Sequence, residues 1–291
     1  MPVLHTNLFY TTVVDSSQRC RASEEESMSD ITSKIPLWSP VAMAASALLV
    51  VACATTPPSA AKVPTTPTIK TADGVAQYPE GYRGTPARAP GEDPFISPTN
   101  SALVLIDYQP HILMGVRNVD HAELLNNTKG LIKSAVHFGI PIIFSHVGVG
   151  LKGSQPFLEE LVELAPDAVI IDRTNVNAWE EPEFVEAVRA TGRDKLIMGG
   201  LWTDVCLAYP AIEAAKAGYD VLVPEDTVGS ITQLSHDNGM KRMQAAGVET
   251  ITWNVVLAEL QRDHARTSTE KETTRIFLEY LFKMDPDKGW K

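Results

Sequence analysis

A cysteine, an aspartate and an arginine stand where three apolar runs of the chain end. Asp107 follows the run at 102–106, Arg173 follows the run at 168–172, and Cys206 comes just after the run at 195–201. The carboxyl ends of parallel strands border the ligand crevice of an open sheet, so we expect the three side chains to converge. Cys206 also opens a predicted helix at 204–217, where free backbone N–H groups and the helix dipole favour a thiolate.

These residue types suit covalent catalysis. A thiolate attacks a carbonyl or imine carbon, the Asp107 carboxylate takes up and returns the proton and later activates water, and Arg173 keeps the other two groups ionised. The backbone N–H groups of Trp202 and Cys206 are the predicted oxyanion donors. Each residue alone also has an ordinary interpretation, which is packing for Cys206, a turn for Asp107 and a surface cation for Arg173.

Motifs for another nucleophile, a dinucleotide loop or a metal site are weak in this sequence. Ser145 ends a strand without a following helix turn, so it ranks below Cys206 as a nucleophile. The glycine-rich segment at 148–153 lacks the spacing of a dinucleotide loop. The histidines are scattered without ligand spacing, and His146 is interpreted as a pocket wall. We therefore predict no metal and no cofactor.

Composition narrows the possible partners. The 291 residues carry a formal net charge of −11, which argues against nucleic acid because phosphate binding needs a basic surface. Apolar residues make up 44% of the chain, an ordinary share for a globular protein. We predict a small-molecule substrate for this acidic protein.

The N-terminal third resembles a bacterial lipoprotein signal. An apolar run at 37–52 follows Lys34 and precedes Cys53, the predicted lipidation site, and Met28 is a possible true start. Residues 1–53 are therefore predicted to be a signal region, and the Pro/Thr/Ala-rich stretch 54–97 a disordered tether. This predicts a lipid anchor in the bacterial cell envelope, facing the periplasm, as the only membrane contact. If the signal is not used, the protein is cytoplasmic. Among the three cysteines only Cys206 then remains as a free thiol.

From residue 98 onward, apolar runs alternate with amphipathic stretches. The predicted strands are 102–106, 141–146, 168–172, 195–201, 220–224 and 249–253. The predicted helices are 122–138, 155–164, 181–191, 204–217 and 235–246. This alternation is typical of an α/β fold with a parallel sheet and helices on both faces. The folded domain is placed at 98–265, with a helical extension at 266–291.

Four segments, taken in order, resemble the isochorismatase-like cysteine hydrolases, and most closely their YcaC-related branch. The segments are 102–109 (ALVLIDYQ), 172–179 (DRTNVNAW), 200–206 (GLWTDVC) and 252–253 (TW). The resemblance implies a three-layer α/β/α sandwich with a six-stranded, mainly parallel sheet, and a homo-oligomer. It further implies hydrolysis of an amide-like C–N bond through a thioester. Asp107 would occupy the general-base position, Cys206 that of the nucleophile, and the Leu201–Trp202 peptide would be cis.

The chain departs from the wider family at Arg173, where most members have lysine and the YcaC-related branch shares the arginine. Arginine acts as an electrostatic partner and not as a proton shuttle. The cysteine argues against true isochorismatase chemistry, and the metal-binding residues of nicotinamidases are missing. We expect Tyr108, Asn177, Trp179 and Trp202 to line an aromatic pocket, with core or interface packing as the alternative.

Two further alternatives to the hydrolase stay open at this stage. One is a non-catalytic binding or scaffold protein of the same fold, and the other is a thiol redox sensor. The apparent pKa of the thiol discriminates the hydrolase from the scaffold, because a value near that of a free cysteine would favour the scaffold. The redox sensor predicts sulfenate formation without amide turnover.

Overall fold

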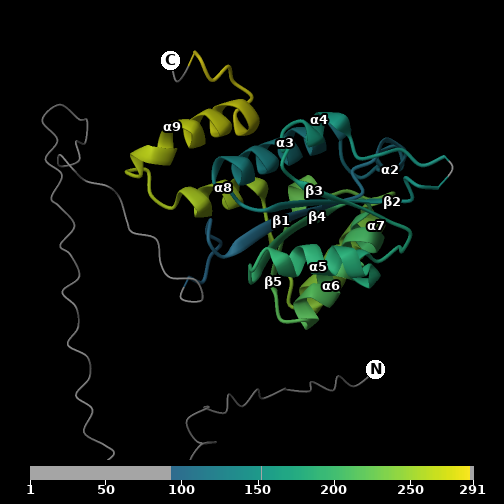
Figure 1. The fold of residues 1–291 in the computed structure, drawn as a ribbon. Helices are drawn as coiled ribbons and strands as arrows, with labels where there is room; N and C mark the ends of the chain where they lie inside the picture. The colour runs from purple at the N-terminus through teal and green to yellow at the C-terminus, as the bar shows by residue number, and fades with distance from the viewer. Residues whose placement is uncertain (1–92, 152, 289–291) are drawn as a thin grey trace, which may run out of the picture. The chain divides into compact units, whose positions relative to one another are not determined.

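A computed structural model describes residues 93–151 and 153–288 (Figure 1). Its six strands are all parallel and lie in the order β3-β2-β1-β4-β5-β6, which confirms the predicted fold class. They are β1 (Ser101–Ile106), β2 (Ile142–Val147), β3 (Val169–Arg173), β4 (Lys195–Gly200), β5 (Asp220–Pro224) and β6 (Glu249–Ile251). The chain reverses its direction of winding between β1 and β4, where ligand crevices form in such sheets.

Helices cover both faces of the sheet (Figure 1). One face carries α3 (His121–His137), α4 (Glu159–Val162), α8 (Trp253–Gln261) and α9 (Thr267–Ile276). The other carries α5 (Pro182–Ala190), α6 (Ala208–Lys216) and α7 (Gln233–Ala245). Shorter pieces are α2 (Pro110–Leu113), the 3₁₀ turns Ala178–Glu180 and Glu225–Thr227, and the π turns Thr203–Leu207 and Phe277–Leu281.

Strand β1 shows why the apolar runs become central strands. Leu103 and Leu105 pack into the cluster beneath α3 and α8, whereas Val104 and Ile106 pack into the cluster beneath α5 and α6. All four are fully buried, and each such side chain stabilises the fold by about 1.5–3 kcal/mol. A strand covered on both faces has no polar side, which explains its unbroken apolar sequence.

The folded part begins before the predicted end of the tether. Asp93 accepts two hydrogen bonds from the Arg262 guanidinium, at 3.1 and 2.9 Å, and the Ile96 N–H donates to Glu259 on α8. Residues 93–97 therefore belong to the domain. The predicted signal region, the start at Met28, the lipidation of Cys53 and most of the tether lie outside the described residues and stay predictions.

The C-terminal extension is helical, as expected, and packs on the same chain. Asn126 of α3 donates to the carbonyl of Tyr280, and Thr273 of α9 donates to Gln261 of α8. Within residues 93–151 and 153–288, no helix has both the length and the apolar character needed to cross a bilayer.

Candidate active site

Asp107 and Arg173 form a buried ion pair at the carboxyl ends of β1 and β3. The guanidinium Nη1 and Nη2 atoms each donate to one carboxylate oxygen, both at 2.9 Å, and both side chains are fully buried. Asp107 leaves β1 with a φ of 61°, a left-handed conformation that aspartate tolerates better than most residues. The predicted convergence of these two residues is therefore present.

Cys206 lies in the π turn Thr203–Leu207 that follows β4. The turn is marked by the bond from the Leu207 N–H to the Trp202 carbonyl, five residues back. Gly200 makes room for it, because a Cβ at that position would lie 3.1 Å from the Leu207 Cβ. The thiol of Cys206 hydrogen-bonds to the Asp107 carboxylate, so all three predicted residues meet at one end of the sheet.

The thiol does not favour its ionised form, and this part of the prediction was wrong. Burial, followed by the negative charge of Asp107 and its hydrogen bond, raises the pKa of Cys206 to about 12. Arg173 and the Trp202 N–H lower this pKa, but their effect is smaller. Desolvation raises the thiol pKa by more than the start of a helix lowers it, because burial penalises the charged thiolate and not the neutral thiol. The resting sulfur is protonated.

Trp202 contributes through both its backbone and its side chain. The Leu201–Trp202 peptide is cis, as the family resemblance implies. The Trp202 N–H hydrogen-bonds to the Cys206 sulfur in the resting site. Its indole is half-buried and donates from Nε1 to the Ile112 carbonyl of α2, at 3.0 Å. This ring therefore stands beside the thiol-bearing turn, held against α2.

The other predicted pocket residues are occupied elsewhere. Tyr108 is fully buried in the core, where its hydroxyl donates to the Thr227 carbonyl at 2.6 Å, so its assignment to a pocket wall was wrong. Asn177 donates to Glu213 of α6 at 3.1 Å. Trp179 packs edge-to-face on two aromatic rings, those of Phe184 and Tyr219. Strict alternation would place residue 108 on the face of Ile106, but the left-handed backbone of Asp107 breaks the strand, and Tyr108 packs into the same cluster as Leu105.

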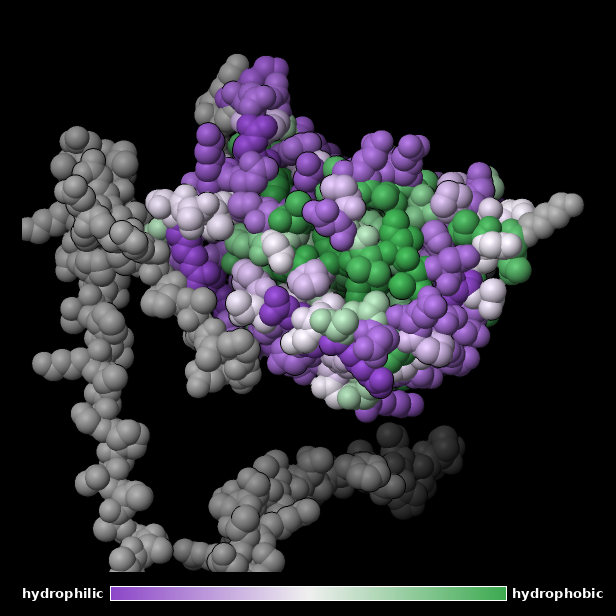
Figure 2. Space-filling view, in the orientation of Figure 1, coloured by the Kyte–Doolittle hydropathy of each residue, from purple (hydrophilic) through white to green (hydrophobic). Residues whose placement is uncertain are grey.

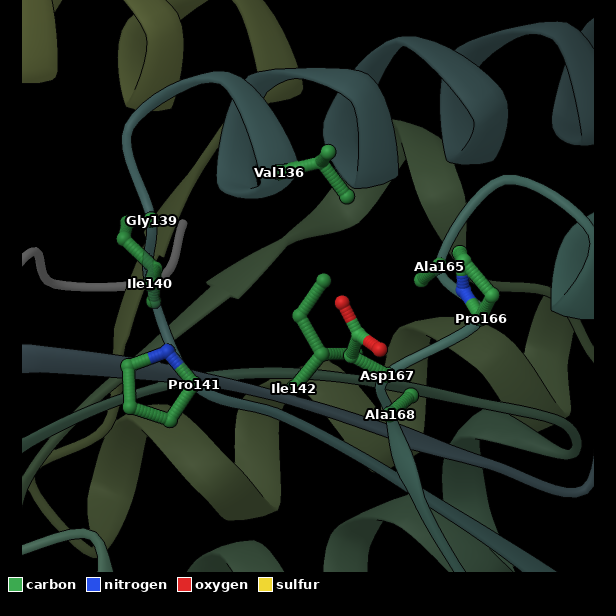
Figure 3. Close-up of a pocket in the computed structure, with 9 residues that line it drawn as sticks. All are labelled: Val136, Gly139, Ile140, Pro141, Ile142, Ala165, Pro166, Asp167 and Ala168. Carbon is green, nitrogen blue, oxygen red and sulfur yellow. The ribbon is translucent and has the colours of Figure 1, made fainter.

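The cavity drawn in Figure 3 lies at the opposite end of the sheet from the ion pair. Its volume is about 310 Å³, and it is lined by residues that precede or start β2 and β3. Figure 3 shows Val136 of α3 above it, with Pro141 and Ile142 below. Active sites of such folds lie at the carboxyl ends of strands, so this cavity is not the predicted substrate pocket.

Two neighbours of the ion pair received no catalytic role in the sequence analysis. Gln109 bridges the end of β2 to the next loop: it accepts from the Val147 N–H at 2.9 Å and donates to the Gln155 carbonyl at 2.5 Å. Burial lowers the pKa of His146, which is also influenced by the charges of Asp172, Asp107 and Arg173. The strand-end position of His146 was a signal, whereas nothing in the sequence marked Gln109 beyond its place in the first motif.

No cluster of three or more histidine, cysteine or acidic side chains suited to a metal ion occurs within the part of the chain that the structure describes. The donor set at the site is a thiol, a carboxylate and a guanidinium. The guanidinium occupies both carboxylate oxygens of Asp107. A thiol beside a carboxylate of this kind can exchange its proton with the carboxylate.

Comparison with known proteins places this geometry in a family. The isochorismatase domain profile matches residues 101–255. The "Probable hydrolase YcaC" of Escherichia coli (strain K12) is 36% identical over 166 residues, which cover 56% of this chain and 79% of that protein.

Two solved structures have the same fold. YcaC from Pseudomonas aeruginosa, with hexane-2,5-diol and covalent acrylamide, has a TM-score of 0.62 and 33% identity, covering 65% of this chain and 93% of that one. YcaC from Escherichia coli, described as an octameric hydrolase of unknown specificity, has a TM-score of 0.62 and 32% identity, covering 66% and 93%. With the family profile spanning more than half of its length, the chain belongs to the isochorismatase family, in its YcaC-related branch.

Proposed function

We propose that this isochorismatase-family hydrolase cleaves the C–N bond of a small amide-like substrate, with Cys206 as nucleophile. Asp107 is the general base and acid, and Arg173 holds its carboxylate in place. The observation that carries this proposal is the hydrogen bond from a buried thiol to a carboxylate that a guanidinium binds through both of its oxygens. Position and charge of the base are thereby set before any substrate arrives.

The raised thiol pKa determines the order of events. Because the sulfur is protonated at rest, the proton moves to Asp107 as the S–C bond forms. The oxyanion is stabilised by the backbone N–H groups of Trp202 and Cys206, after the Trp202 N–H has turned from the sulfur to the new oxygen. Collapse breaks the C–N bond, and the departing amine takes the proton from Asp107.

The second half of the reaction regenerates the thiol. Asp107 removes a proton from water, whose oxygen attacks the thioester carbonyl carbon. The tetrahedral intermediate collapses by breaking the S–C bond, the acid leaves, and the sulfur takes the proton back from Asp107. Arg173 stays protonated throughout, because a guanidinium does not give up its proton at working pH.

Two relatives support the proposals that Cys206 is reactive and that the chain forms a homo-oligomer. YcaC from Pseudomonas aeruginosa holds covalent acrylamide, and an activated alkene of this kind is a target for a reactive thiol. We propose Cys206 as the residue that such reagents modify here. The Escherichia coli relative is octameric, and we propose that this chain is also a homo-oligomer.

The test replaces the nucleophile and compares turnover of a panel of small amides. We expect Cys206→Ala to abolish hydrolysis and the labelling of the site by iodoacetamide. Ser145→Ala is the matched control, because Ser145 lies in the neighbouring strand β2 opposite Ile106 and its buried hydroxyl has no hydrogen-bond partner among the described residues, so turnover should be unchanged. Unchanged turnover in the Cys206 variant would reject the assignment.

The burial of Cys206 leaves a second candidate function open. Burial of the Cys206 thiol makes it poorly reactive when its base is not engaged, which is compatible with a non-catalytic binding protein of the same fold, although such a protein does not require the raised pKa. Absence of turnover and of labelling in the wild-type protein would favour it. The same raised pKa argues against a redox sensor, since peroxide oxidation starts from the thiolate.

A further inference from the structure

Helix α7 touches the backbone of the turn that carries Cys206. The contact is made at Gly239, where a Cβ atom would lie 2.7 Å from the Asp204 Cα and 2.9 Å from the Asp204 backbone nitrogen. Both of these are main-chain atoms, which cannot rotate away as a flexible side chain can. Position 239 therefore admits only glycine without displacing the π turn.

One helical turn earlier, His236 holds the same π turn through its imidazole. Nδ1 lies 3.0 Å from the Thr203 hydroxyl, and Nε2 lies 3.4 Å from a carboxylate oxygen of Glu225. In the neutral tautomer that donates from Nε2 to this carboxylate, Nδ1 accepts the proton of the Thr203 hydroxyl. His236 is 5% exposed and Thr203 is fully buried, so water does not compete for the bond between them, whereas Glu225 is exposed.

The loop before α7 also hydrogen-bonds to the π turn. The Thr203 N–H donates to the Gly229 carbonyl at 3.0 Å, and the Ser230 hydroxyl donates to the Asp204 carboxylate at 2.6 Å. Thr203 and Asp204 are thus each held through backbone and side chain. They lie between Trp202, whose N–H reaches the sulfur, and Cys206 itself.

We propose that His236 and Gly239 are positioning residues, which set the place of the Cys206 sulfur relative to Asp107. The proposal rests on the proposed function in so far as Cys206 is the reactive thiol. Since the resting thiol is protonated, its reactivity depends on transfer of the proton to Asp107. A displacement of about 1 Å weakens such a transfer by one to two orders of magnitude.

The first test compares two glycines at which an added Cβ would be crowded, by backbone atoms at Gly239 and by a side-chain ring at Gly130. A Cβ at Gly239 meets the π turn, whereas a Cβ at Gly130 of α3 would lie 2.9 Å from the Trp253 ring, on the other face of the sheet. The probe is iodoacetamide: the S–C bond forms, iodide leaves, and the thiol proton goes to Asp107. The rate of Cys206 alkylation at neutral pH is followed by peptide mass spectrometry, and the melting temperature is measured alongside.

We expect Gly239→Ala to slow the alkylation of Cys206 by about five-fold or more, and Gly130→Ala to leave it within about two-fold at a similar loss of melting temperature. A wild-type rate for Gly239→Ala, or an equal slowing in Gly130→Ala, would overturn the proposal. The readout needs no amide substrate. Amide turnover that survives in Cys206→Ala would therefore reject the nucleophile without bearing on this result.

The second test uses His236 and does not depend on how the glycine variant folds. His236→Ala removes the acceptor of the Thr203 hydroxyl, whereas His236→Asn offers an amide oxygen close to the position of Nδ1. We expect the alanine variant to be alkylated slowly and the asparagine variant to recover most of the wild-type rate. Equal rates in the two variants would overturn the role of this hydrogen bond.

Discussion

Asp107 and Arg173 are two full charges removed from water at the end of a parallel sheet. Taking such charges out of water costs several kcal/mol each, and only paired geometry with satisfied hydrogen bonds offsets that cost. The two parallel 2.9 Å bonds provide the paired geometry, whereas the buried Nε of Arg173 has no hydrogen-bond partner among the described residues. An arrangement of this kind adds little to stability compared with apolar packing, so its presence at a strand end favours a chemical role.

Two substitutions of Arg173 separate the effect of its positive charge from the effect of its two hydrogen bonds to Asp107. Arg173→Ala leaves the carboxylate buried without a counter-ion, so we expect the free energy of unfolding to fall by about 3–5 kcal/mol. Arg173→Lys keeps one positive charge but cannot bind both oxygens, so it should fold and be alkylated more slowly at Cys206. Urea denaturation and iodoacetamide labelling give the two readouts.

An exposed ion pair serves as the control for this prediction. Arg275 of α9 pairs with Asp287 at the surface, and Arg275→Ala should change stability little because water screens the pair. A loss of stability in Arg173→Ala no larger than in Arg275→Ala would contradict the account of the buried pair.

At the scale of elements, the strands were predictable and the local turns were not. Strand β5 was expected at 220–224 and lies at Asp220–Pro224, because a run buried on both faces has a distinct apolar composition. The last run was expected to extend to residue 253. It ends at Ile251, and Trp253 opens α8, because Asp226, 27 residues away, accepts a hydrogen bond from the Trp253 N–H.

The turn at Cys206 shows what spacing cannot predict. Its position after β4 was apparent from the apolar run, and so was its meeting with Asp107. Its π form and the raised thiol pKa depend on burial and on contacts from α7, which lies some thirty residues further along the chain. Tyr108 is similar, because its entry into the core depends on the left-handed backbone of Asp107, which ends the alternation of β1.

The start of α8 yields a prediction about pH. Burial raises the pKa of Asp226 above its unfolded value, so this group stabilises the fold most below the unfolded pKa, and the contribution declines as the pH rises through the folded pKa. Asp226→Asn keeps an oxygen that can accept from the Trp253 N–H and stays neutral. We expect this variant to gain stability relative to wild type between about pH 4 and pH 7, measured by urea denaturation. A difference that does not vary with pH would contradict the raised pKa.

At the scale of the whole molecule, the edge of the sheet at β3 exposes apolar side chains. Among the described residues, β3 pairs only with β2, and its Val169 and Ile170 are 48% and 43% exposed. Figure 2 shows an apolar patch over this strand. Exposed β-branched residues on an unpaired edge invite contact with another chain, and a second copy agrees with the proposed homo-oligomer.

Light scattering coupled to size-exclusion chromatography tests this edge. We expect the wild-type protein to be an oligomer, and Ile170→Lys to reduce the number of subunits because a buried lysine at the contact has no partner. Met284→Lys, at an exposed apolar position after the last π turn, is the matched control and should leave the mass unchanged. An unchanged mass for Ile170→Lys would place the contact elsewhere.

The central claim is that Cys206 forms a bond to the substrate while Asp107 carries its proton. Its most direct measurement is mass spectrometry of the protein quenched during hydrolysis of a small amide. We predict an acyl adduct on the peptide that contains Cys206, accumulating in wild type and lost in Cys206→Ala together with turnover. Hydrolysis that continues in Cys206→Ala, with no adduct on the Cys206 peptide of the wild-type protein, would contradict the account.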